Sequence, residues 1–439
     1  MEKFFKFKDH GTNFKTEIIA GVTTFFAMAY IIFVNPGMLS AAGMDFMAVT
    51  VATCVASAIG CFLTAFLANV PFAQAPGMGL NAFFTYTVCL TMGYTWQEGL
   101  AIVLISGLLF LIVTISPLRT KIISSIPAAL KKAIGAGIGL FIAFIGLLNA
   151  GIVTTTASNI TSLGAVTTGP ALVAIIGILI TAVLLAYKVK GAIFIGILAT
   201  TLVGIPFGVT TFPESLVEKG INMSTFGACF TEGFGGLMKL GFLPLVTAII
   251  TFAIVDCFDT VGTLIGTASA NNMLDKDGNF PGGDKALIAD AVATCVGAVC
   301  GTSTVTTFVE SSTGISEGGR TGFSSIVTGA LFLLAILLAP VAGIIPSAAT
   351  APALIIVGVF MLKNAVDIPW GDMETAIPCF LTIAMMPFAY SISDGIGFGF
   401  ISYTVIKVCR GKAKEVPVLM YVLSALFILK YILSALPAG

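Results

Sequence analysis

The stretch PFAQAPGMGLNAFF, residues 71–84, interrupts an apolar region of the chain with proline and glycine. A second stretch of this kind, TFVESSTGISEGGRTG, occupies residues 307–322. Each follows the string VATCV, which stands at 51–55 and again at 292–296. Upstream of the two strings, a further pair of segments matches in outline: TFFAMAYIIFVNPGML at 24–39 and TFAIVDCFDTVGTLI at 251–265. Three matches in the same order predict an internal repeat.

The composition predicts that this repeat lies in a membrane. Of 439 residues, 57% are hydrophobic and 10% are charged, against about 25% charged in an ordinary soluble domain. Runs such as 166–188 and 323–345 reach the roughly 20 apolar residues that a membrane-spanning helix needs, and they lack the alternation of an outer-membrane barrel strand. Lys plus Arg and Asp plus Glu each total 21, which excludes a basic nucleic-acid binder. We expect a lipid bilayer around the chain and no nucleic-acid partner.

The rare residue types exclude most enzyme classes. A single histidine, His10, nearly excludes histidine-based zinc sites and Ser-His catalysis. The nine cysteines are scattered without a CxxC pair and are interpreted as small buried hydrophobes. The chain has no Walker loop, no HExxH and no nucleophile elbow. We therefore expect no enzyme activity, no cofactor and no metal.

Hydropathy predicts about fourteen membrane spans. They are residues 18–34, 47–69, 72–93, 98–116, 133–150, 166–188, 190–208, 243–268, 286–301, 305–320, 322–345, 350–363, 374–391 and 394–409. Seven spans, an odd number, separate the two copies of the repeat, so the copies should have opposite orientations. A last apolar stretch, 417–436, is either an extra span or a helix at the membrane surface.

Lysine and arginine set the orientation. They gather in the N-terminal segment and after spans four, six and fourteen: Lys3, Lys6, Lys8, Lys15, Arg119, Lys121, Lys131, Lys132, Lys188, Lys190, Lys407, Arg410, Lys412 and Lys414. All of them fall on one side if the N-terminus is cytoplasmic. The charged N-terminus lacks the apolar core of a cleaved signal peptide. We expect a multi-pass protein of the cell membrane with a cytoplasmic N-terminus.

Broken spans in an inverted repeat are typical of a secondary transporter. A break exposes backbone N–H and C=O groups inside the membrane, so it survives only where it lines a cavity. The interrupting residues are Pro76, Gly77 and Gly79 in span three and Ser311, Ser312, Thr313 and Gly314 in span ten. Helix starts at these breaks would offer free N–H donors to a ligand. The alternative is a pair of glycine motifs for close helix packing.

Carboxyl groups lie where charge is costly. Asp256 and Asp259 fall within span eight, and Glu310 falls at the break in span ten. A charge at the centre of a span costs roughly 2.5–3.5 kcal/mol on insertion scales, so each is a functional hypothesis. Asp256 and Asp259 share a helix face and cannot both ionise easily, which suits a proton-coupled carrier.

Three further charged residues receive structural interpretations. Glu317 and Arg320, spaced i,i+3 after the second break, are expected to pair with each other. Asp290, near the start of span nine, is expected at the membrane interface.

Four motifs together resemble one transporter family. They are TTFFAMAYIIFVNPGML, PFAQAPGMGLNAFF, VDCFDTVGTLIGTAS and FVESSTGISEGGRTG. In this order they resemble the AzgA-like hypoxanthine/guanine permeases of the nucleobase/cation symporter-2 family. The resemblance runs from Phe14 to about Lys414.

The resemblance implies an all-α polytopic membrane fold. It has about fourteen spans in a 7+7 inverted repeat, with core and gate domains and short extended segments breaking spans 3 and 10. The implied division is 1–17 as a cytoplasmic segment, 18–132 and 243–345 as the two halves of the core (spans 1–4 and 8–11), and 133–242 and 346–439 as the two halves of the gate (spans 5–7, and 12–14 with the C-terminal apolar helix).

The resemblance also implies residue roles. Glu310 resembles the carboxylate that holds the base through its ring N–H groups, and Asp259 resembles the acidic residue of span eight. Asn81 resembles a span-three position needed for purine transport, and Thr24 stands where related carriers often have a polar or histidine residue. Asp256 has no clear counterpart outside this branch.

Further pocket residues complete the expected site. Phe72 and Phe308, at the two breaks, are expected either to stack on the base or to be ordinary packing aromatics. The remaining residues expected beside the base are Ala73, Ser311 and Ser312. For the proton we expect chiefly Asp259, with Glu310 and Asp256 as the other candidates.

The resulting hypothesis is a proton symporter that imports purine bases by an elevator-like movement. Hypoxanthine and guanine are the expected substrates, with adenine as a further candidate, because a carboxylate accepts N–H donors through strong charge-assisted bonds. The alternatives are an anion or other small-solute transporter of the same architecture, which would need a positive site for an anion, and a passive channel, which would need polar residues along several spans. The preferred base, proton against sodium, and monomer against homodimer stay open.

Overall fold

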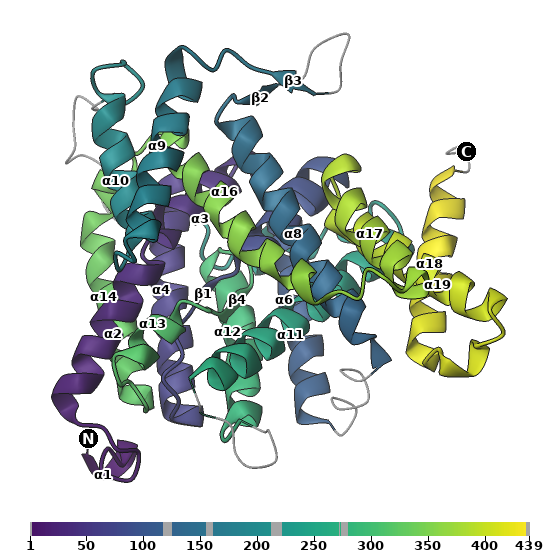
Figure 1. The fold of residues 1–439 in the computed structure, drawn as a ribbon, viewed down its shortest axis with the longest axis horizontal. Helices are drawn as coiled ribbons and strands as arrows, with labels where there is room; N and C mark the ends of the chain where they lie inside the picture. The colour runs from purple at the N-terminus through teal and green to yellow at the C-terminus, as the bar shows by residue number, and fades with distance from the viewer. Residues whose placement is uncertain are drawn as a thin grey trace.

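The computed structural model describes residues 2–116, 125–154, 161–211, 222–271, 273 and 280–435. Of the basic residues used for orientation, Arg119 and Lys121 lie outside this part of the chain. In Figure 1 the first helix lies at the bottom and the short strands β2 and β3 at the top, with helices running between these two ends.

The elements of the first half are α1 (Glu2–Phe5), α2 (Phe14–Met28), α3 (Ile31–Leu39), η1 (Ser40–Ala42), α4 (Phe46–Leu63), η2 (Thr64–Ala68), β1 (Gln74–Pro76), α5 (Met78–Ala82), η3 (Phe83–Thr91), α6 (Trp96–Ile115), α8 (Ala128–Asn149), β2 (Val153–Thr154), β3 (Ser162–Leu163), α9 (Gly169–Ala186), α10 (Ala192–Gly204) and η4 (Cys229–Gly233). Those of the second half are α11 (Phe242–Ala270), α12 (Gly283–Cys300), β4 (Val305–Thr307), α13 (Ser311–Ser316), α14 (Gly322–Ala335), η5 (Ile336–Leu338), α15 (Ala339–Ala342), α16 (Ser347–Leu362), η6 (Lys363–Asp367), α17 (Met373–Phe388), α18 (Ile392–Cys409), η7 (Ala413–Glu415) and α19 (Val418–Ala435).

Side-chain caps fix where several of these helices begin. Asn13 accepts a hydrogen bond from the Thr16 N–H at the start of α2, and Asp45 accepts one from the Ala48 N–H at the start of α4. Thr95 and Glu98 form a capping box at the start of α6. Each cap satisfies N–H groups that have no acceptor within the helix, so residues next to each start determine where the helix begins.

Within the described residues, eight helices are long and apolar enough to cross a membrane by length and composition. Most other predicted spans correspond to shorter helices, and spans three and ten are each split between a strand and helical turns. Span one is also split, because α2 ends at Met28 and α3 begins at Ile31. The predicted span 322–345 changes geometry as well, since α14 ends at Ala335, the 3₁₀ turn η5 follows, and α15 begins at Ala339.

The two broken spans meet as a pair of antiparallel strands, near the centre of Figure 1. Gln74 lies opposite Thr307, and Pro76 lies opposite Val305. The pairing is extended at both ends by the Gly77 N–H to Thr304 O bond at 3.1 Å and the Phe308 N–H to Ala73 O bond at 3.0 Å. Antiparallel pairing of equivalent segments is the arrangement that two copies of opposite orientation produce. The predicted inverted repeat is confirmed.

Side chains from the flanking helices satisfy the outer edges of this two-stranded ribbon. On α4, the Cys61 sulfur accepts from the Gln74 N–H at 3.3 Å and donates to the Gln74 carbonyl at 3.5 Å. On α12, the Thr294 hydroxyl donates to the Val305 carbonyl at 3.0 Å. These contacts leave little backbone polarity unpaired in a region without water.

The spanning helices pack in two sets. In the first, α4 packs against α12 and α14, α6 packs against α12, and α2 packs against α14. In the second, α8 packs against α16 and α17, α9 packs against α10 and α16, and α17 packs against α18. Glycines allow the closest approach within the second set, because a Cβ on Gly358 would lie 2.5 Å from the Gly139 carbonyl oxygen.

The expected pair between Glu317 and Arg320 is wrong. Glu317 instead accepts from Lys190, at the turn before α10, with 2.5 Å between Nζ and Oε1. Arg320 donates to the backbone carbonyls of Ile315 at 2.6 Å and Gly319 at 2.7 Å. The reason is that α13 ends at Ser316 and the chain turns through glycines, so the i,i+3 relation of a helix is lost.

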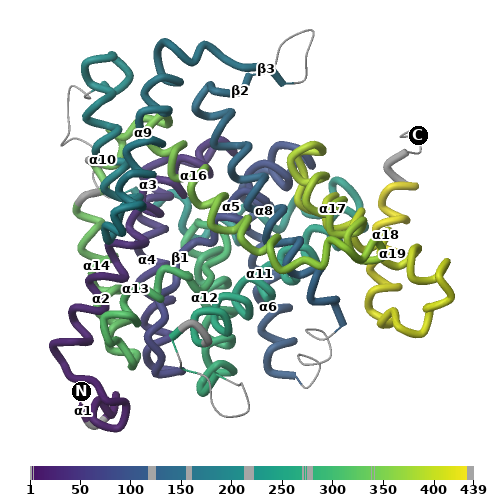
Figure 2. The backbone as a smooth tube through the Cα atoms, viewed as in Figure 1, coloured from purple at the N-terminus to yellow at the C-terminus, as the bar shows by residue number. Residues whose placement is uncertain are grey.

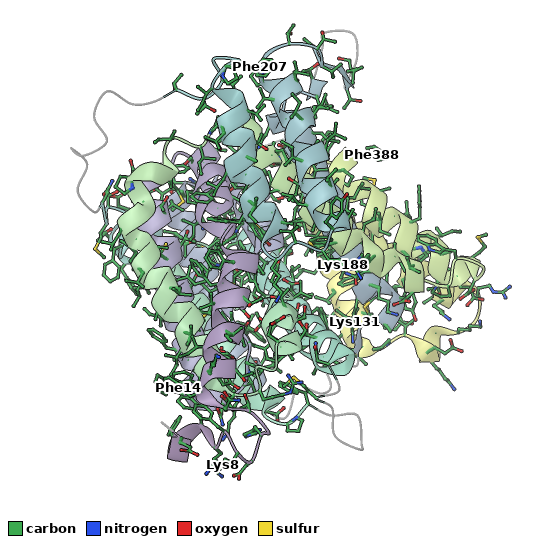
Figure 3. The ribbon with its side chains drawn as sticks, turned by 60° about the vertical axis from the view of Figure 1, so that its left-hand side comes forward. Lys8, Phe14, Lys131, Lys188, Phe207 and Phe388 are labelled. Carbon is green, nitrogen blue, oxygen red and sulfur yellow. The ribbon has the colours of Figure 1, made fainter. Side chains whose placement is uncertain are left out.

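Figure 3 labels three of the basic residues that were used for orientation. In Figure 3, Lys8 lies at the bottom and Phe207 at the top, with Lys131 and Lys188 between them. Figure 2 shows the backbone in the view of Figure 1, with the N-terminus at the lower left. A cytoplasmic position for the basic residues used for orientation stays a prediction.

The last helix runs back along α18. Thr404 and Ser424 approach to 2.9 Å, the rings of Phe400 and Phe427 lie 6.4 Å apart, and further along the Lys430 ammonium contacts the Asp394 carboxylate at 2.7 Å. From the first of these contacts to the last, the residue numbers fall on α18 and rise on α19, so the two helices run antiparallel. The contacts on α18 extend over about three turns. This geometry favours an extra span over a helix lying flat at the surface.

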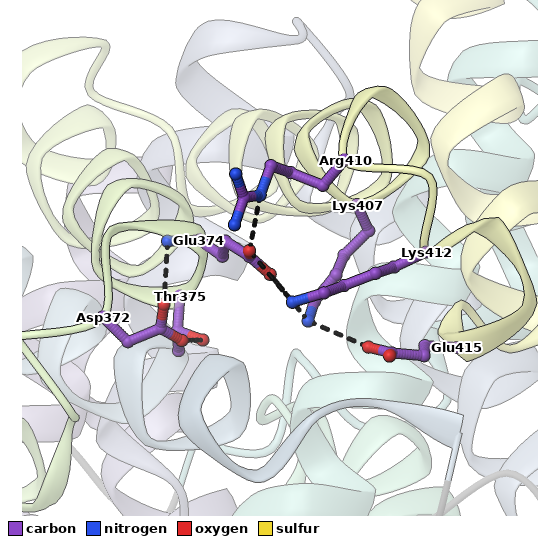
Figure 4. Close-up of polar contacts among 7 residues, drawn as sticks. All are labelled: Asp372, Glu374, Thr375, Lys407, Arg410, Lys412 and Glu415. Atoms are coloured by element: carbon purple, nitrogen blue, oxygen red, sulfur yellow. Dashed lines mark hydrogen bonds and ion pairs between the residues drawn. The ribbon is translucent and has the colours of Figure 1, made fainter.

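Glu374, at the start of α17, is the centre of a cluster of charges (Figure 4). Its carboxylate contacts Lys407 at 3.1 Å, Arg410 at 2.8 Å and Lys412 at 2.8 Å. Lys407 also contacts Glu415 at 3.1 Å. The cluster ties the start of α17 to the end of α18, within the basic group that the sequence analysis assigns to the cytoplasmic side.

We expect the end of α19 to lie on the opposite side of the membrane from residues 410–415, because α19 retraces α18. Green fluorescent protein fused after Lys412 should fluoresce in cells, whereas the same fusion after Ala435 should be dark and an alkaline phosphatase fusion there should be active. Two fluorescent fusions would instead mean that α19 does not cross.

We expect Glu374→Gln to lower the midpoint of thermal unfolding, because three cations lose their shared carboxylate. The matched control is Glu415→Gln, since Glu415 contacts only one of these cations, and its effect should be smaller. High salt should reduce the difference in unfolding midpoint between Glu374→Gln and the unchanged protein, because salt screens exposed charges. Equal midpoints for the two variants would contradict the central role of Glu374.

Candidate functional site

Glu310 lies three residues after the end of the crossing strand β4 and immediately before α13. The β-branched residues Val305–Thr307 favour the extended backbone that carries it there. Its carboxylate oxygen Oε1 accepts a hydrogen bond from the Tyr30 hydroxyl at 2.7 Å. Glu310 is half-buried, so the protein encloses this residue only in part.

Asp259 lies near Glu310. It is half-buried on α11, and its carboxylate is close enough to that of Glu310 for the two charges to interact. Asp256, one turn earlier, is fully buried and accepts from the Thr294 hydroxyl of α12 at 2.8 Å. The two aspartates of span eight therefore have different surroundings: Asp259 is half-buried within electrostatic range of Glu310, and Asp256 is enclosed against α12.

The expectation of free N–H donors at the start of α13 is wrong. The N–H of Ser311 donates to the Phe308 carbonyl at 3.2 Å, that of Ser312 to the Val309 carbonyl at 3.0 Å, and that of Thr313 to the Glu310 carbonyl at 2.9 Å. The chain enters α13 through a tight turn that uses these donors itself.

Asp290 is not at the membrane interface, contrary to expectation. It is fully buried and accepts from Thr260 at 2.7 Å, Thr307 at 3.0 Å and Gln74 at 3.3 Å. One carboxylate thus joins α11, α12 and both crossing strands. Its place follows from α12 beginning at Gly283, which puts Asp290 two turns inside the helix.

The remaining expected residues surround the crossing at different depths. Asn81 is fully buried; Ser303 donates to its side-chain oxygen, and its amide donates to the Pro76 carbonyl at 3.4 Å. Thr24 is buried against α13, where a Cβ on Gly314 would overlap its hydroxyl. Both residues therefore support the crossing through packing and hydrogen bonds within the protein.

Of the other five residues, Ala73 and Ser311 join the two breaks. The Ala73 N–H donates to the Ser311 hydroxyl at 3.0 Å, and Ser312 is half-buried one residue further along. The Phe72 ring is fully buried and packs edge-on against Phe280 at 5.4 Å, as an ordinary packing aromatic would. The Phe308 ring lies 6.5 Å from that of Tyr30, beside the residue that contacts Glu310.

Three polar residues of the crossing were missed in the sequence. Tyr30 is buried at the joint of α2 and α3, Gln74 bridges the strands to Asp290, and Asn35 donates to Thr53 at 2.7 Å and Thr302 at 2.9 Å. All three are uncharged at neutral pH, so a search for charged groups in apolar runs passes over them. The available signal was a hydrogen-bonding side chain within an otherwise apolar run.

The site as a whole is acidic. Glu310 and Asp259 are accessible, Asp256 and Asp290 are enclosed, and all the hydrogen bonds that they accept from other side chains of the described residues come from uncharged groups. Within the described residues no group of three or more His, Cys, Asp and Glu could hold a metal ion. The arrangement suits a neutral, N–H-bearing ligand, because buried carboxylates accept such donors strongly.

Comparisons with known proteins agree with this chemistry. The sequence profile of the permease family matches residues 15–398. A putative permease of Methanocaldococcus jannaschii is 48% identical over 433 residues, covering 98% of both chains. The guanine/hypoxanthine permease PbuG of Bacillus subtilis is 44% identical over 442 residues, covering 98% of this chain and 99% of the relative. The adenine permease AdeP of Escherichia coli is 40% identical over 432 residues, covering 98% and 96%.

Two solved structures share the fold. The transmembrane domain of the cyanobacterium bicarbonate transporter BicA has a TM-score of 0.66 at 16% identity, covering 87% of this chain and 97% of that chain. The murine anion transporter Solute Carrier 26 family member A9 has a TM-score of 0.64 at 10% identity, covering 90% and 69%. The 7+7 inverted-repeat fold is thereby confirmed. Taken with the sequence matches, it follows that the chain belongs to the permease family, within its AzgA-like branch of purine permeases, and is a transporter rather than an enzyme.

Proposed function

We propose that this protein imports purine bases, hypoxanthine and guanine first and adenine as a further candidate, by proton symport. The observation that carries the proposal is the half-buried Glu310 carboxylate beside Asp259 at the crossing of the two broken spans. Similar proteins are named guanine/hypoxanthine and adenine permeases, which supports this substrate class.

The chemistry of recognition follows from what a purine base offers. Hypoxanthine and guanine carry ring N–H donors beside a carbonyl acceptor on a flat apolar ring. The Glu310 carboxylate accepts an N–H through a charge-assisted bond, and Phe308 lies beside it as an apolar surface. In this proposal Asp259 contributes a second accessible acceptor, and Asn81, Thr24, Phe72, Ala73, Ser311 and Ser312 shape the crossing around the base.

We assign movement to the two packed sets of helices. The first set corresponds to the core, residues 18–132 and 243–345, and the second to the gate, residues 133–242 and 346–439. In an elevator-like cycle the core carries the crossing strands and the base past the gate. The proposal draws on the fact that β1 and β4 contact helices of the first set, α4 and α12, on their outer edges.

We assign the coupling proton chiefly to Asp259. Its carboxylate is accessible and close to Glu310, so the presence of a proton there changes the charge that the base meets. Binding of proton and base is then interdependent, as coupling requires. A core that carries one negative charge less also crosses the low-dielectric barrier at lower cost. Glu310 and Asp256 are the next candidates.

An anion transporter is the second candidate, because both solved structures of the same fold transport anions by their titles. The acidic crossing opposes it, since carboxylates repel an anion in a low-dielectric site. We further propose residence in the cell membrane with the N-terminus cytoplasmic, and a homodimer as one of two open assembly states.

The first prediction concerns Glu310→Gln. The amide keeps the size but removes the charge and one acceptor, so an N–H of the bound base loses its partner. Hypoxanthine binding to the purified protein should weaken at least about tenfold, since a bond to a charged group contributes about 1.5–3 kcal/mol.

The matched control for Glu310→Gln is Glu317→Gln, in the turn that ends α13 and in contact with Lys190, which should bind normally. Unchanged binding to Glu310→Gln would remove Glu310 from the pocket.

The second prediction concerns coupling. Uptake of hypoxanthine should rise as external pH falls toward about 5–6, because the inward proton gradient grows, and an uncoupler should abolish accumulation. Asp259→Asn resembles the protonated form, so base exchange across the membrane should persist while concentrative uptake is lost.

Asp372→Asn, at the start of α17 and away from the crossing, is the control for the loss of one carboxylate. If Asp259→Asn cells still concentrate hypoxanthine in a pH-dependent way, the proton binds elsewhere. If uptake by the unchanged protein follows external sodium and ignores pH, proton coupling itself is wrong.

A further inference from the structure

Tyr30 is built rigidly into the crossing. It lies at the joint where α2 ends and α3 begins, and its side chain is only 1% exposed. Its hydroxyl reaches across 280 positions of sequence to Glu310 Oε1 at 2.7 Å, and its ring packs beside that of Phe308 at 6.5 Å. A buried ring has few orientations open to it, so the hydroxyl stays where it is.

This contact makes the two oxygens of Glu310 unequal. Oε1 already accepts a hydrogen bond from the Tyr30 hydroxyl, which uses one of its two lone pairs, whereas Oε2 accepts no hydrogen bond from another side chain within the described residues. The neighbouring Val309 is half-exposed and Glu310 is half-buried. The carboxylate therefore offers an approaching ligand one strong acceptor, Oε2, and one weaker acceptor, Oε1, rather than a matched pair.

The number of available oxygens matters for telling two purines apart. Guanine has two N–H donors side by side, on the ring nitrogen N1 and on the exocyclic amine at C2. Hypoxanthine has the same N1–H but carries only a C–H at C2. A free carboxylate would bind guanine with two parallel bonds and hypoxanthine with one, and two-pronged carboxylate recognition is both stronger and more selective.

We propose that Tyr30 is a positioning residue that sets base selectivity by occupying Glu310 Oε1, so that hypoxanthine and guanine are accepted nearly equally. The inference rests on the proposed function, because it assumes that the base meets Glu310. With Oε1 already bonded to Tyr30, the extra bond that the guanine amine forms and hypoxanthine lacks is weak. Asp259 is available to both bases and is present in the unchanged protein and in every variant compared below. It therefore does not cause the expected change in selectivity between guanine and hypoxanthine.

The experiment measures the affinities of guanine and hypoxanthine by competition against radiolabelled hypoxanthine on the purified protein. For the unchanged protein, guanine should bind less than about fivefold more tightly than hypoxanthine, a difference below about 1 kcal/mol. In Tyr30→Phe, which removes only the hydroxyl, guanine should gain on hypoxanthine by about tenfold, the effect of one added bond to a charged group.

The control is Tyr94→Phe. Tyr94 is also buried, and its hydroxyl donates to the Leu237 carbonyl at 3.3 Å, away from Glu310. This variant should leave the ratio of affinities unchanged. A shift in selectivity that is confined to Tyr30→Phe separates positioning of the carboxylate from a general loss of stability, which would weaken both bases alike.

Each outcome decides the inference. If the unchanged protein binds guanine more than fivefold more tightly than hypoxanthine, the inference is overturned, even if Tyr30→Phe fails to fold. A preference for guanine below fivefold supports the inference. An unchanged ratio in folded Tyr30→Phe also overturns it, while leaving the import of purines intact. If the unchanged protein binds neither base, the proposed function fails and this inference fails with it.

Discussion

Backbone hydrogen bonding inside the membrane is the constraint on which the rest of the structure depends. A lipid environment offers no water to an unpaired N–H or C=O, so two broken spans can exist only if each satisfies the other. The antiparallel pairing of Gln74–Pro76 with Val305–Thr307 does this, and Cys61 and Thr294 satisfy the outer edges. The break in each half of the repeat is therefore stable because the other half is present.

The same crossing gathers the acidic groups. Glu310 lies three residues after the end of β4, and Asp290 holds both strands to α11 and α12 through three uncharged donors. Asp259 then sits on the accessible side and Asp256 on the enclosed side. The strand pairing thus fixes which carboxylates can meet a ligand and which can only hold the crossing together.

Local sequence patterns predicted much of the fold. Proline and glycine at 76–79 and small polar residues at 311–314 located both breaks, and the position of VATCV in each half predicted their opposite orientations. Glu310 and Asp259 were found because a charge in an apolar run is rare and costly. Their closeness in space agrees with the predicted crossing of spans three and ten.

Contacts between distant segments could not be predicted in this way. Tyr30 and Glu310 are 280 residues apart, and nothing local in either segment specifies the other. Glu317 pairs with Lys190 instead of Arg320, because α13 ends at Ser316 and the chain turns between Glu317 and Arg320. An i,i+3 spacing predicts a contact only within a continuous helix. Asp290 was misplaced because its partners come from three other elements, α11, β1 and β4, which meet only in the folded chain.

The sulfur of Cys61 has a consequence for observing this protein at work. It is fully buried and bonded to both the N–H and the carbonyl of Gln74, so a thiol reagent reaches it only when β1 separates from α4. The rate at which a small maleimide modifies Cys61 therefore reports how often the crossing opens, with the protein's own cysteine as the built-in probe.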